Sequence, residues 1–252
     1  MISSKKIRLS AAFISIATSQ CVLAADGEGI STSFGIRGWA AEWAGNAGGG
    51  TAPNGSGGSV EVIGDAKSKT STAIIPFVSL RYGDFGISGS AMLRKTFTLE
   101  GSNTSLSSDR QEWDVNGSYY FAPGVSASVG YKKIMWTNVV IKGPIVAGSA
   151  SAPLAGGFGM YGTAAYGWLK TDVNDPGFAS GAKTVYNLLE GGLTYSLGPM
   201  VGLKGTALTL GYRTQRIKAK NLWPIRSSNS PTTFSDTIDL TSGPILGFVA
   251  TF

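Results

Sequence analysis

Apolar and polar residues alternate along most of the chain with a period of two. In the stretch FGISGSAML, Phe85, Ile87 and Leu93 fall on one face, and glycine and serine fall on the other. The segments at 113–121 and 208–213 repeat this pattern. Because successive side chains of a strand point to opposite faces, the pattern predicts β-strands that each have one apolar face.

The alternation predicts ten strands, and eight or twelve strands remain alternatives. Most of the segments are longer than the five or six residues typical of strands in globular proteins. The sixth segment alternates least well, but without it the short and long connections cannot be kept on opposite sides. The predicted strands are residues 29–44, 70–83, 85–98, 110–122, 124–137, 139–152, 157–170, 183–197, 204–218 and 235–252.

The predicted connections alternate between tight turns and long polar loops. Tight turns are predicted at 82–86, 121–125, 153–157 and 196–202, and long loops at 45–69, 99–109, 171–182 and 219–235. A soluble sandwich also has one apolar face per strand, but it has shorter strands. Short turns on one side and long loops on the other are typical of an outer-membrane barrel. The fold class expected is therefore all-β, a transmembrane antiparallel up-and-down β-barrel.

Residues 143–169 carry no charge and are long enough for a membrane-spanning helix. The segment nevertheless contains seven glycines together with Pro144 and Pro153, which disfavour a continuous helix. It also breaks at Pro153–Gly157, as a turn does. The strand interpretation is preferred here too.

Aromatic residues provide an independent indication of the membrane boundaries. One group lies beside the short turns or at the end of the chain, and a second group lies at the long-loop ends. Trp39 and Trp43 do not fit, because they share a face with Arg37. Such segregation indicates two interfacial girdles. The short-turn group is Tyr82, Phe85, Phe121, Phe158, Tyr195 and Phe252, and the long-loop group is Trp113, Trp136 and Trp168.

The first 25 residues predict a cleaved export signal. Lys5, Lys6 and Arg8 precede a short apolar core, and small residues end at Ala24. Cys21 suggests a lipoprotein site as an alternative, although the residues around it fit that motif poorly. The expected organisation is a signal peptide at 1–25 and a barrel domain at 26–252. Loss of three basic residues lowers the net charge from +6 to +3, so the basic pI does not indicate nucleic-acid binding.

The composition disfavours several kinds of active site. The sequence has no histidine and one cysteine, Cys21, which lies within the predicted signal. Histidine-dependent nucleophilic sites and zinc sites with nitrogen and sulfur ligands are therefore not expected. GFGMYG at 157–162 matches a dinucleotide pattern by chance, because a strand follows it. DVNDPG at 172–177 lacks the glutamate of a calcium loop. We expect neither an enzyme nor a bound cofactor or metal.

The alternation also predicts which charged residues face the interior. Unpaired charges in a narrow interior are costly, so these residues should form ion pairs or line water. One interpretation is a structural salt-bridge network, and the other is a constricted pore whose basic excess favours anions. The predicted inward residues are Arg37, Arg81, Arg94, Asp114, Lys132, Lys142, Glu190, Arg213 and Asp239.

The export signal, the alternating strands and the C-terminal phenylalanine together resemble the class of Gram-negative outer-membrane β-barrel proteins. The resemblance covers residues 28–252 and identifies no single family. It implies an outer-membrane location, contact with outer-membrane lipid and assembly by the barrel-assembly machinery. It also implies that Leu246, Phe248, Ala250 and Phe252 form the signal that this machinery reads.

Three functions remain open at this stage. The leading hypothesis is a narrow passive channel for small polar or anionic solutes. The alternative is a non-conducting structural or surface-interaction barrel whose long loops bind a partner. The third is a secreted β-sandwich adhesin. The solute, the loop partner and the oligomeric state do not follow from the sequence.

Overall fold

The structure, a computed structural model, describes residues 14–16, 21–23, 29–47, 50–53, 59–62, 65–100, 105–173, 181–227 and 230–252. Almost all of these residues lie in β-strands. The helical element among them is the short 3-10 turn η1 (Ala155–Gly157). In these ranges no helix is both long and apolar enough to cross a membrane.

Eleven strands form one antiparallel sheet that closes on itself, because β15 (Ser230–Thr251) pairs with β3 (Ile30–Ala47). β6 (Asp65–Ser68) and β7 (Ser71–Tyr82) both lie between β3 and β8 (Phe85–Glu100), so together they fill one position. The eleven strands therefore occupy ten positions around the ring. The predicted up-and-down barrel is confirmed. The β-sandwich hypothesis is wrong, because a sandwich consists of two sheets packed face to face and here one sheet closes on itself.

The remaining strands follow one another around the ring in chain order. They include the weakly alternating sixth segment, which is a full strand paired on both sides. Two short pairs are not members of the ring sheet: β1 (Ile14–Ile16) with β2 (Cys21–Leu23), and β4 (Gly50–Pro53) with β5 (Ser59–Val62). β1 contacts β11 and β12, and β2 contacts β3 and β15. The other ring strands are β9 (Ser105–Ala122), β10 (Val125–Trp136), β11 (Val139–Pro153), β12 (Phe158–Val173), β13 (Ala182–Met200) and β14 (Leu203–Ser227).

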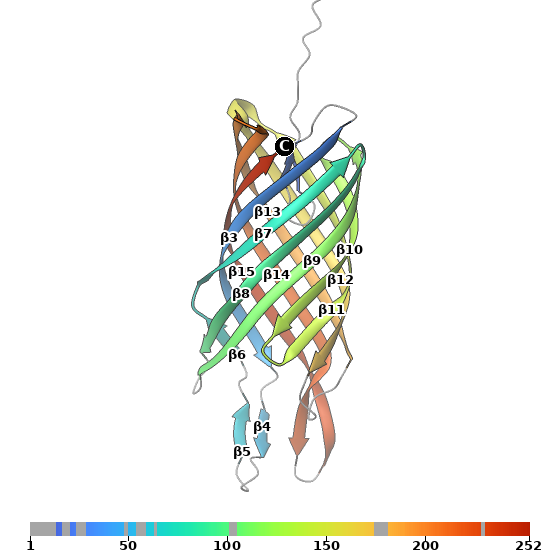
Figure 1. Ribbon diagram of the computed structural model, residues 1–252. Coiled ribbons are helices and arrows are strands. Elements are labelled where there is room, and N and C mark those ends of the chain that lie inside the picture. The colour runs from blue at the N-terminus through green and yellow to red at the C-terminus, as the bar shows by residue number, and fades with distance from the viewer. Residues whose placement is uncertain are drawn as a thin grey trace, which may run out of the picture.

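The tight turns and the C-terminus lie at one end of the barrel, which we call the short-turn end (Figure 1). Gly83 and Gly124 have positive φ angles of 56° and 75° in two of these turns. Glycine suits such positions because a side chain disfavours this conformation. The opposite end, where the predicted long loops lie, is the long-loop end.

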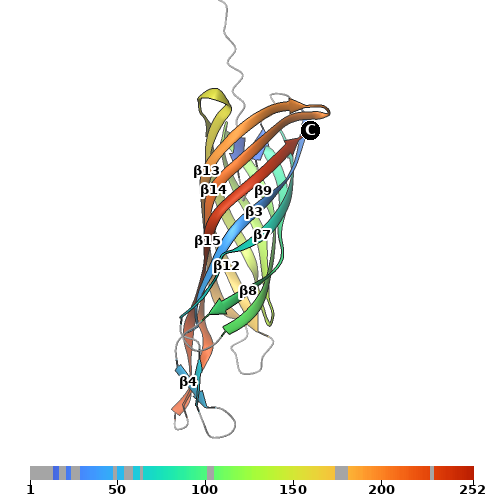
Figure 2. The same cartoon turned by 90° about the vertical axis from the view of Figure 1, so that its left-hand side faces the viewer.

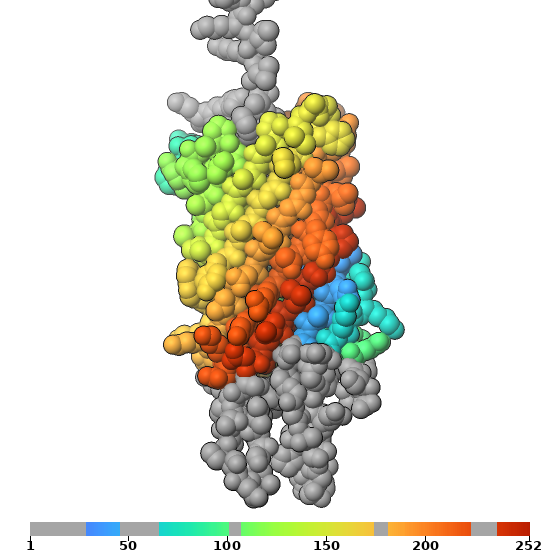
Figure 3. All heavy atoms as spheres, turned by 180° about the vertical axis from the view of Figure 1, so that it is seen from behind, coloured from blue at the N-terminus to red at the C-terminus, as the bar shows by residue number. Residues whose placement is uncertain are grey.

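The outer wall of the barrel is apolar, as a membrane-facing surface requires. Side chains such as Ile36, Val78, Ile87, Leu193 and Leu246 are exposed and point away from the interior. The wall is continuous where β15 meets β3, seen as adjacent red and blue surfaces in Figure 3.

At the long-loop end the strands run further than predicted. β14 continues to Ser227 and β15 begins at Ser230, so most of the predicted loop at 219–235 is a hairpin. β4 contacts β14, and the β4–β5 hairpin and the β14–β15 hairpin project together from this end (Figure 2). The part of the predicted signal peptide outside β1 and β2 lies outside the described residues.

Candidate functional site

Among the described residues, four positive and four negative side chains are buried in the interior of the barrel. Each of them is at most 6% exposed. The sequence predicted more basic than acidic residues in the interior, whereas the buried charges are equal in number. The positive residues are Arg37, Arg110, Lys132 and Arg213, and the negative residues are Glu112, Asp114, Glu190 and Asp239.

Polar contacts that involve these charged side chains and the uncharged Gln215 cross the lumen. Gln215 Nε2 donates to Glu112 Oε1 at 2.9 Å. Gln215 lies on β14 and Glu112 on β9, five positions apart in a ring of ten and therefore on opposite walls. Arg110 Nη1 lies 3.4 Å from Asp239 Oδ1 on β15. This set of interior contacts is the trans-lumen network.

Glu112 is the centre of the network. Its Oε1 lies 2.7 Å from Arg110 Nη2, and its Oε2 lies 2.8 Å from Lys132 Nζ. A second set joins Glu190 to Arg213 at 3.3 Å and to Arg37 at 3.5 Å. Buried charges persist only when opposite charges and hydrogen bonds compensate their desolvation, which is the arrangement here.

Aromatic rings pack against the cations of the network. The guanidinium of Arg213 lies 5.0 Å from the ring centre of Trp39, and that of Arg110 lies 5.5 Å from Trp43. Lys132 Nζ lies 5.3 Å from the Tyr186 ring. These rings fill the space around the ion pairs and stabilise the cations through their faces.

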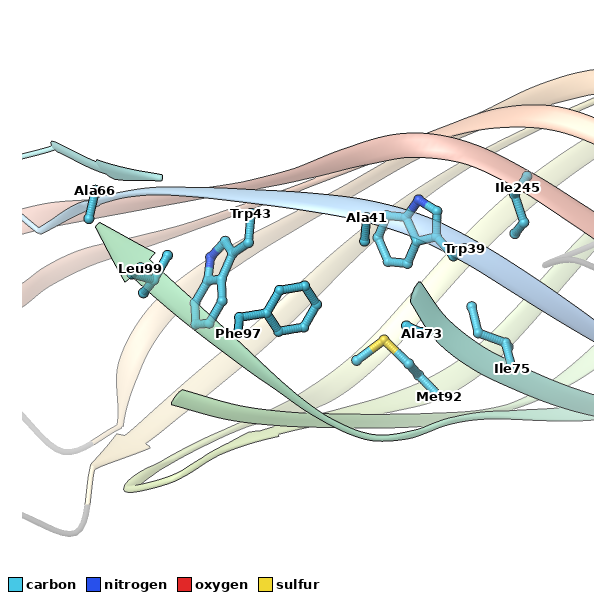
Figure 4. Packing of buried hydrophobic residues seen from close by; sticks show 10 residues of the cluster. All are labelled: Trp39, Ala41, Trp43, Ala66, Ala73, Ile75, Met92, Phe97, Leu99 and Ile245. Atoms are coloured by element: carbon cyan, nitrogen blue, oxygen red, sulfur yellow. The ribbon is translucent and has the colours of Figure 1, made fainter. Parts of the chain in front are cut away.

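Apolar side chains pack together inside the barrel (Figure 4), and those nearest the long-loop end form an apolar layer. Trp43 contacts Phe97 edge-on and Trp136 at a tilt, each with 5.5 Å between ring centres. Leu99 completes the layer from β8, whereas Met92 lies opposite Glu112 at the level of the network. This layer blocks access to the network from the long-loop end.

The short-turn half of the interior is lined by many small hydroxyl side chains and by a buried cluster of Phe77, Tyr161 and Val249. Ser33 and Thr251 hydrogen-bond at 2.9 Å, and Ser149 and Thr163 at 3.1 Å. Such side chains leave more room than the arginines and tryptophans of the middle. The interior therefore has three layers: hydroxyl, ionic and apolar.

The ionic layer contains a cavity of about 10 Å³ among Trp39, Met92, Glu112, Lys132 and Arg213. This is close to the minimum volume that holds one water molecule. The side chains that meet across the lumen at this height are buried, which favours a closed cross-section.

Six of the nine predicted inward charges lie in this network: Arg37, Asp114, Lys132, Glu190, Arg213 and Asp239. Arg81 also faces inward but lies at the short-turn end, where its guanidinium is 4.0 Å from the ring centre of Tyr120.

The prediction was wrong for Arg94, which points outward. A β-bulge between Met92 and Lys95 shifts the alternation of β8 by one residue. The Arg94 side chain is 72% exposed and pairs with Asp109 at 2.6 Å. Asp109 lies beyond the membrane-spanning part of β9. Hydrogen bonds from Thr96 and Arg94 lower the pKa of its carboxyl.

The prediction was also wrong for Lys142, which is 47% exposed and pairs with Asp172 at 3.5 Å. Ile141 and Ile145, on the opposite face of β11 from Lys142, are buried inside. There they belong to a cluster that includes Tyr186 and Leu188. An apolar interior patch reverses the rule that apolar residues face lipid.

Seven of the nine predicted girdle aromatics are exposed on the outer wall, and Trp113 is half-buried. The prediction was wrong for Trp136, which was expected in the long-loop girdle. It lies on the same inward face of β10 as Lys132 and Ile134 and packs inside the barrel. Trp39 and Trp43 are buried inside. The exposed residues are Tyr82, Phe85, Phe121, Phe158, Trp168, Tyr195 and Phe252.

The residues of the implied assembly signal all lie on β15 or directly after it. Leu246 and Phe252 are exposed, Phe248 is half-buried and Ala250 is buried. Phe252 stacks on Phe34 of β3, with 5.4 Å between ring centres. The end of the chain therefore contributes to barrel closure.

Sequence reasoning missed Arg110, Glu112 and Gln215. Arg110 and Glu112 share the inward face of Asp114, and Gln215 shares that of Arg213, so alternation alone would have found them. What alternation cannot give is the bond across the lumen between β9 and β14. Within the described ranges, no group of three or more His, Cys, Asp or Glu side chains could hold a metal ion.

Comparisons with known proteins assign no family to the chain. No protein-family model matches the sequence, and no curated protein matches it. Among solved structures, the outer-membrane protease OmpT from Escherichia coli is 12% identical with a TM-score of 0.49, covering 88% of this chain and 96% of its own. A FadL homologue from Pseudomonas aeruginosa is 8% identical with a TM-score of 0.29, covering 88% and 90%.

The toluene transporter TodX from P. putida is 7% identical with a TM-score of 0.31, covering 90% of each chain. These similarities are too remote to carry an activity to this chain. The strand pairing, the apolar outer wall and the ring closure nevertheless define the fold directly. The protein has the fold of an outer-membrane β-barrel.

Proposed function

We propose that this protein is a non-conducting barrel of the Gram-negative outer membrane that acts at its surface. The observation that carries this proposal is the Gln215–Glu112 hydrogen bond across the lumen, within a layer whose cavity is about 10 Å³. A hydrated ion or small solute needs far more space. The apolar layer around Trp43 and Trp136 adds a second barrier.

The surface role is supported by the two hairpins at the long-loop end. β4–β5 and the extended β14–β15 hairpin lie in contact, which gives a larger and more regular surface than separate loops. We propose that this surface binds a protein partner outside the cell. Contact with outer-membrane lipid and assembly by the barrel-assembly machinery are part of the same proposal.

A narrow passive channel is the second candidate. The hydroxyl-lined half of the interior favours it, because Ser and Thr side chains suit a wet passage. The anion preference expected earlier loses its basis, since the buried interior charges balance. Conduction would require the trans-lumen network to separate.

An enzymatic role is not proposed, because the sequence offers no histidine for the chemistry considered above.

Liposome swelling tests the proposal directly. Proteoliposomes that contain the refolded chain should swell in a small sugar or in gluconate at the rate of protein-free liposomes. A heat-modifiable shift on a gel confirms that the tested protein is folded. A swelling rate that rises with the amount of folded protein would refute the closed barrel and favour the channel.

A further inference from the structure

Four lysines stand directly opposite one another on four neighbouring strands. Lys133 of β10 pairs in register with Lys142 of β11, Lys142 pairs with Lys170 of β12, and Lys170 pairs with Lys183 of β13. We call these residues the lysine row. Directly opposed side chains on adjacent strands have Cβ atoms roughly 5 Å apart, and like charges there are destabilising.

The row lies on the outer wall. Lys142, Lys170 and Lys183 are exposed, and Lys133 is half-buried. β14 continues the positive surface with Lys218, which lies opposite Val185 and pairs with Asp236 at 2.8 Å.

One acidic residue compensates part of the row. Lys142 pairs with Asp172 at 3.5 Å, and among the described residues this is the one ion pair formed by a member of the row. Mutual repulsion of the other lysines is relieved if an anion binds between them.

The position of the row along the wall indicates the anion. Tyr131 lies two residues from Lys133 on the same outward face, and Trp168 lies two residues from Lys170. Trp113 lies opposite Lys133. Tyrosine and tryptophan mark the boundary between hydrocarbon and headgroups. The row therefore lies on the long-loop side of that boundary, at the level of lipid headgroups.

We propose that the lysine row binds the phosphate groups of a phosphorylated lipid in the leaflet at the long-loop end. Lysine ammonium groups bind phosphate as point charges, and adjacent strands space them to share one headgroup. The row is exposed on the outer wall, where a lipid can present its phosphates laterally while its acyl chains cover Tyr166 and Trp168. This inference rests on the membrane location and is independent of whether the lumen conducts.

Native mass spectrometry of the full chain in neutral detergent tests the proposal. The ligand is a phosphorylated glucosamine-based glycolipid, and its control is the same lipid after enzymatic dephosphorylation. The variant Lys170→Gln/Lys183→Gln removes two charges from the row. The matched control is Lys67→Gln/Lys204→Gln, which removes two exposed lysines elsewhere on the barrel.

We expect the wild type and the control variant to bind the phosphorylated lipid alike. The row variant should bind it at least about tenfold more weakly, because each basic residue near a membrane surface contributes roughly 1 kcal/mol. The proposal is overturned if dephosphorylation leaves binding unchanged, or if both variants bind equally. Displacement of the lipid by an equimolar amount of inorganic phosphate would instead identify a free-anion site.

Discussion

Glu112 shows how a single residue closes the lumen of a small barrel. A ten-position ring encloses more space than an eight-stranded one, whose side chains just fill it. Here the additional space is occupied by long side chains that meet at one carboxylate: Arg110 from β9, Lys132 from β10 and the uncharged Gln215 from β14. The charges are therefore part of the packing of the interior, in the way that apolar side chains are in a soluble core.

The Glu112→Ala variant should lose about 3–5 kcal/mol of unfolding free energy, because Arg110 and Lys132 are left as buried charges without this partner. The measurement is the urea dependence of unfolding of the refolded protein in detergent micelles. Glu100→Ala serves as the control, since its pair with Lys69 is exposed and should contribute at most about 1 kcal/mol. Equal midpoints for the two variants would mean that the network does not stabilise the barrel.

At the scale of the strands, the sequence predicts location well and orientation less well. All ten predicted segments correspond to positions in the ring. Most of them show a clear period of two, and the order of short and long connections identifies the weakly alternating sixth. Orientation failed at Arg94 and Lys142. The bulge in β8 has no signature in the alternation of that segment. In β11 an inward apolar patch reverses the usual assignment of faces.

The extension of β14 and β15 is the other difference between prediction and structure. Residues 219–235 have the polar composition of a loop, yet most of them form paired strands beyond the barrel wall. Outside the membrane no apolar face is needed, so the alternation that identifies the other strands is absent there.

The contacts of Phe252, directly after β15, lead to a prediction about assembly of the barrel. Phe252 stacks on Phe34, and its N–H donates to the carbonyl of Thr32 at 2.9 Å. Phe252→Ala should reduce the amount of barrel that reaches the membrane in cells several-fold more than Phe158→Ala does. Phe158 is the matched control, because it packs on Tyr195 at the same end, with 4.8 Å between ring centres.

Membrane fractionation with a heat-modifiable gel measures this difference. Both purified variants should lose a similar amount of stability, about 1 kcal/mol for one aromatic pair. If both variants reach the membrane in equal amounts, Phe252 has no special role in assembly and acts only as a girdle residue.

For the whole molecule, closure of the ring and closure of the lumen have different origins. Ring closure follows from ten alternating segments whose last member pairs with the first, and the sequence predicts this architecture. Lumen closure depends on contacts between residues as far apart as Glu112 and Gln215, whose bond crosses the barrel. Strand periodicity contains no information about such contacts, so the sequence left both a channel and a filled barrel open.

Single-channel recording in planar bilayers tests the closed lumen most directly. The wild-type chain, shown to be folded by its heat-modifiable gel shift, should insert without producing conductance steps. The Trp39→Ala/Trp43→Ala/Gln215→Ala variant should produce them, because it removes the hydrogen bond across the lumen and the central ring of the apolar layer without removing a charge. Stable steps of similar size from folded wild-type protein would contradict the account.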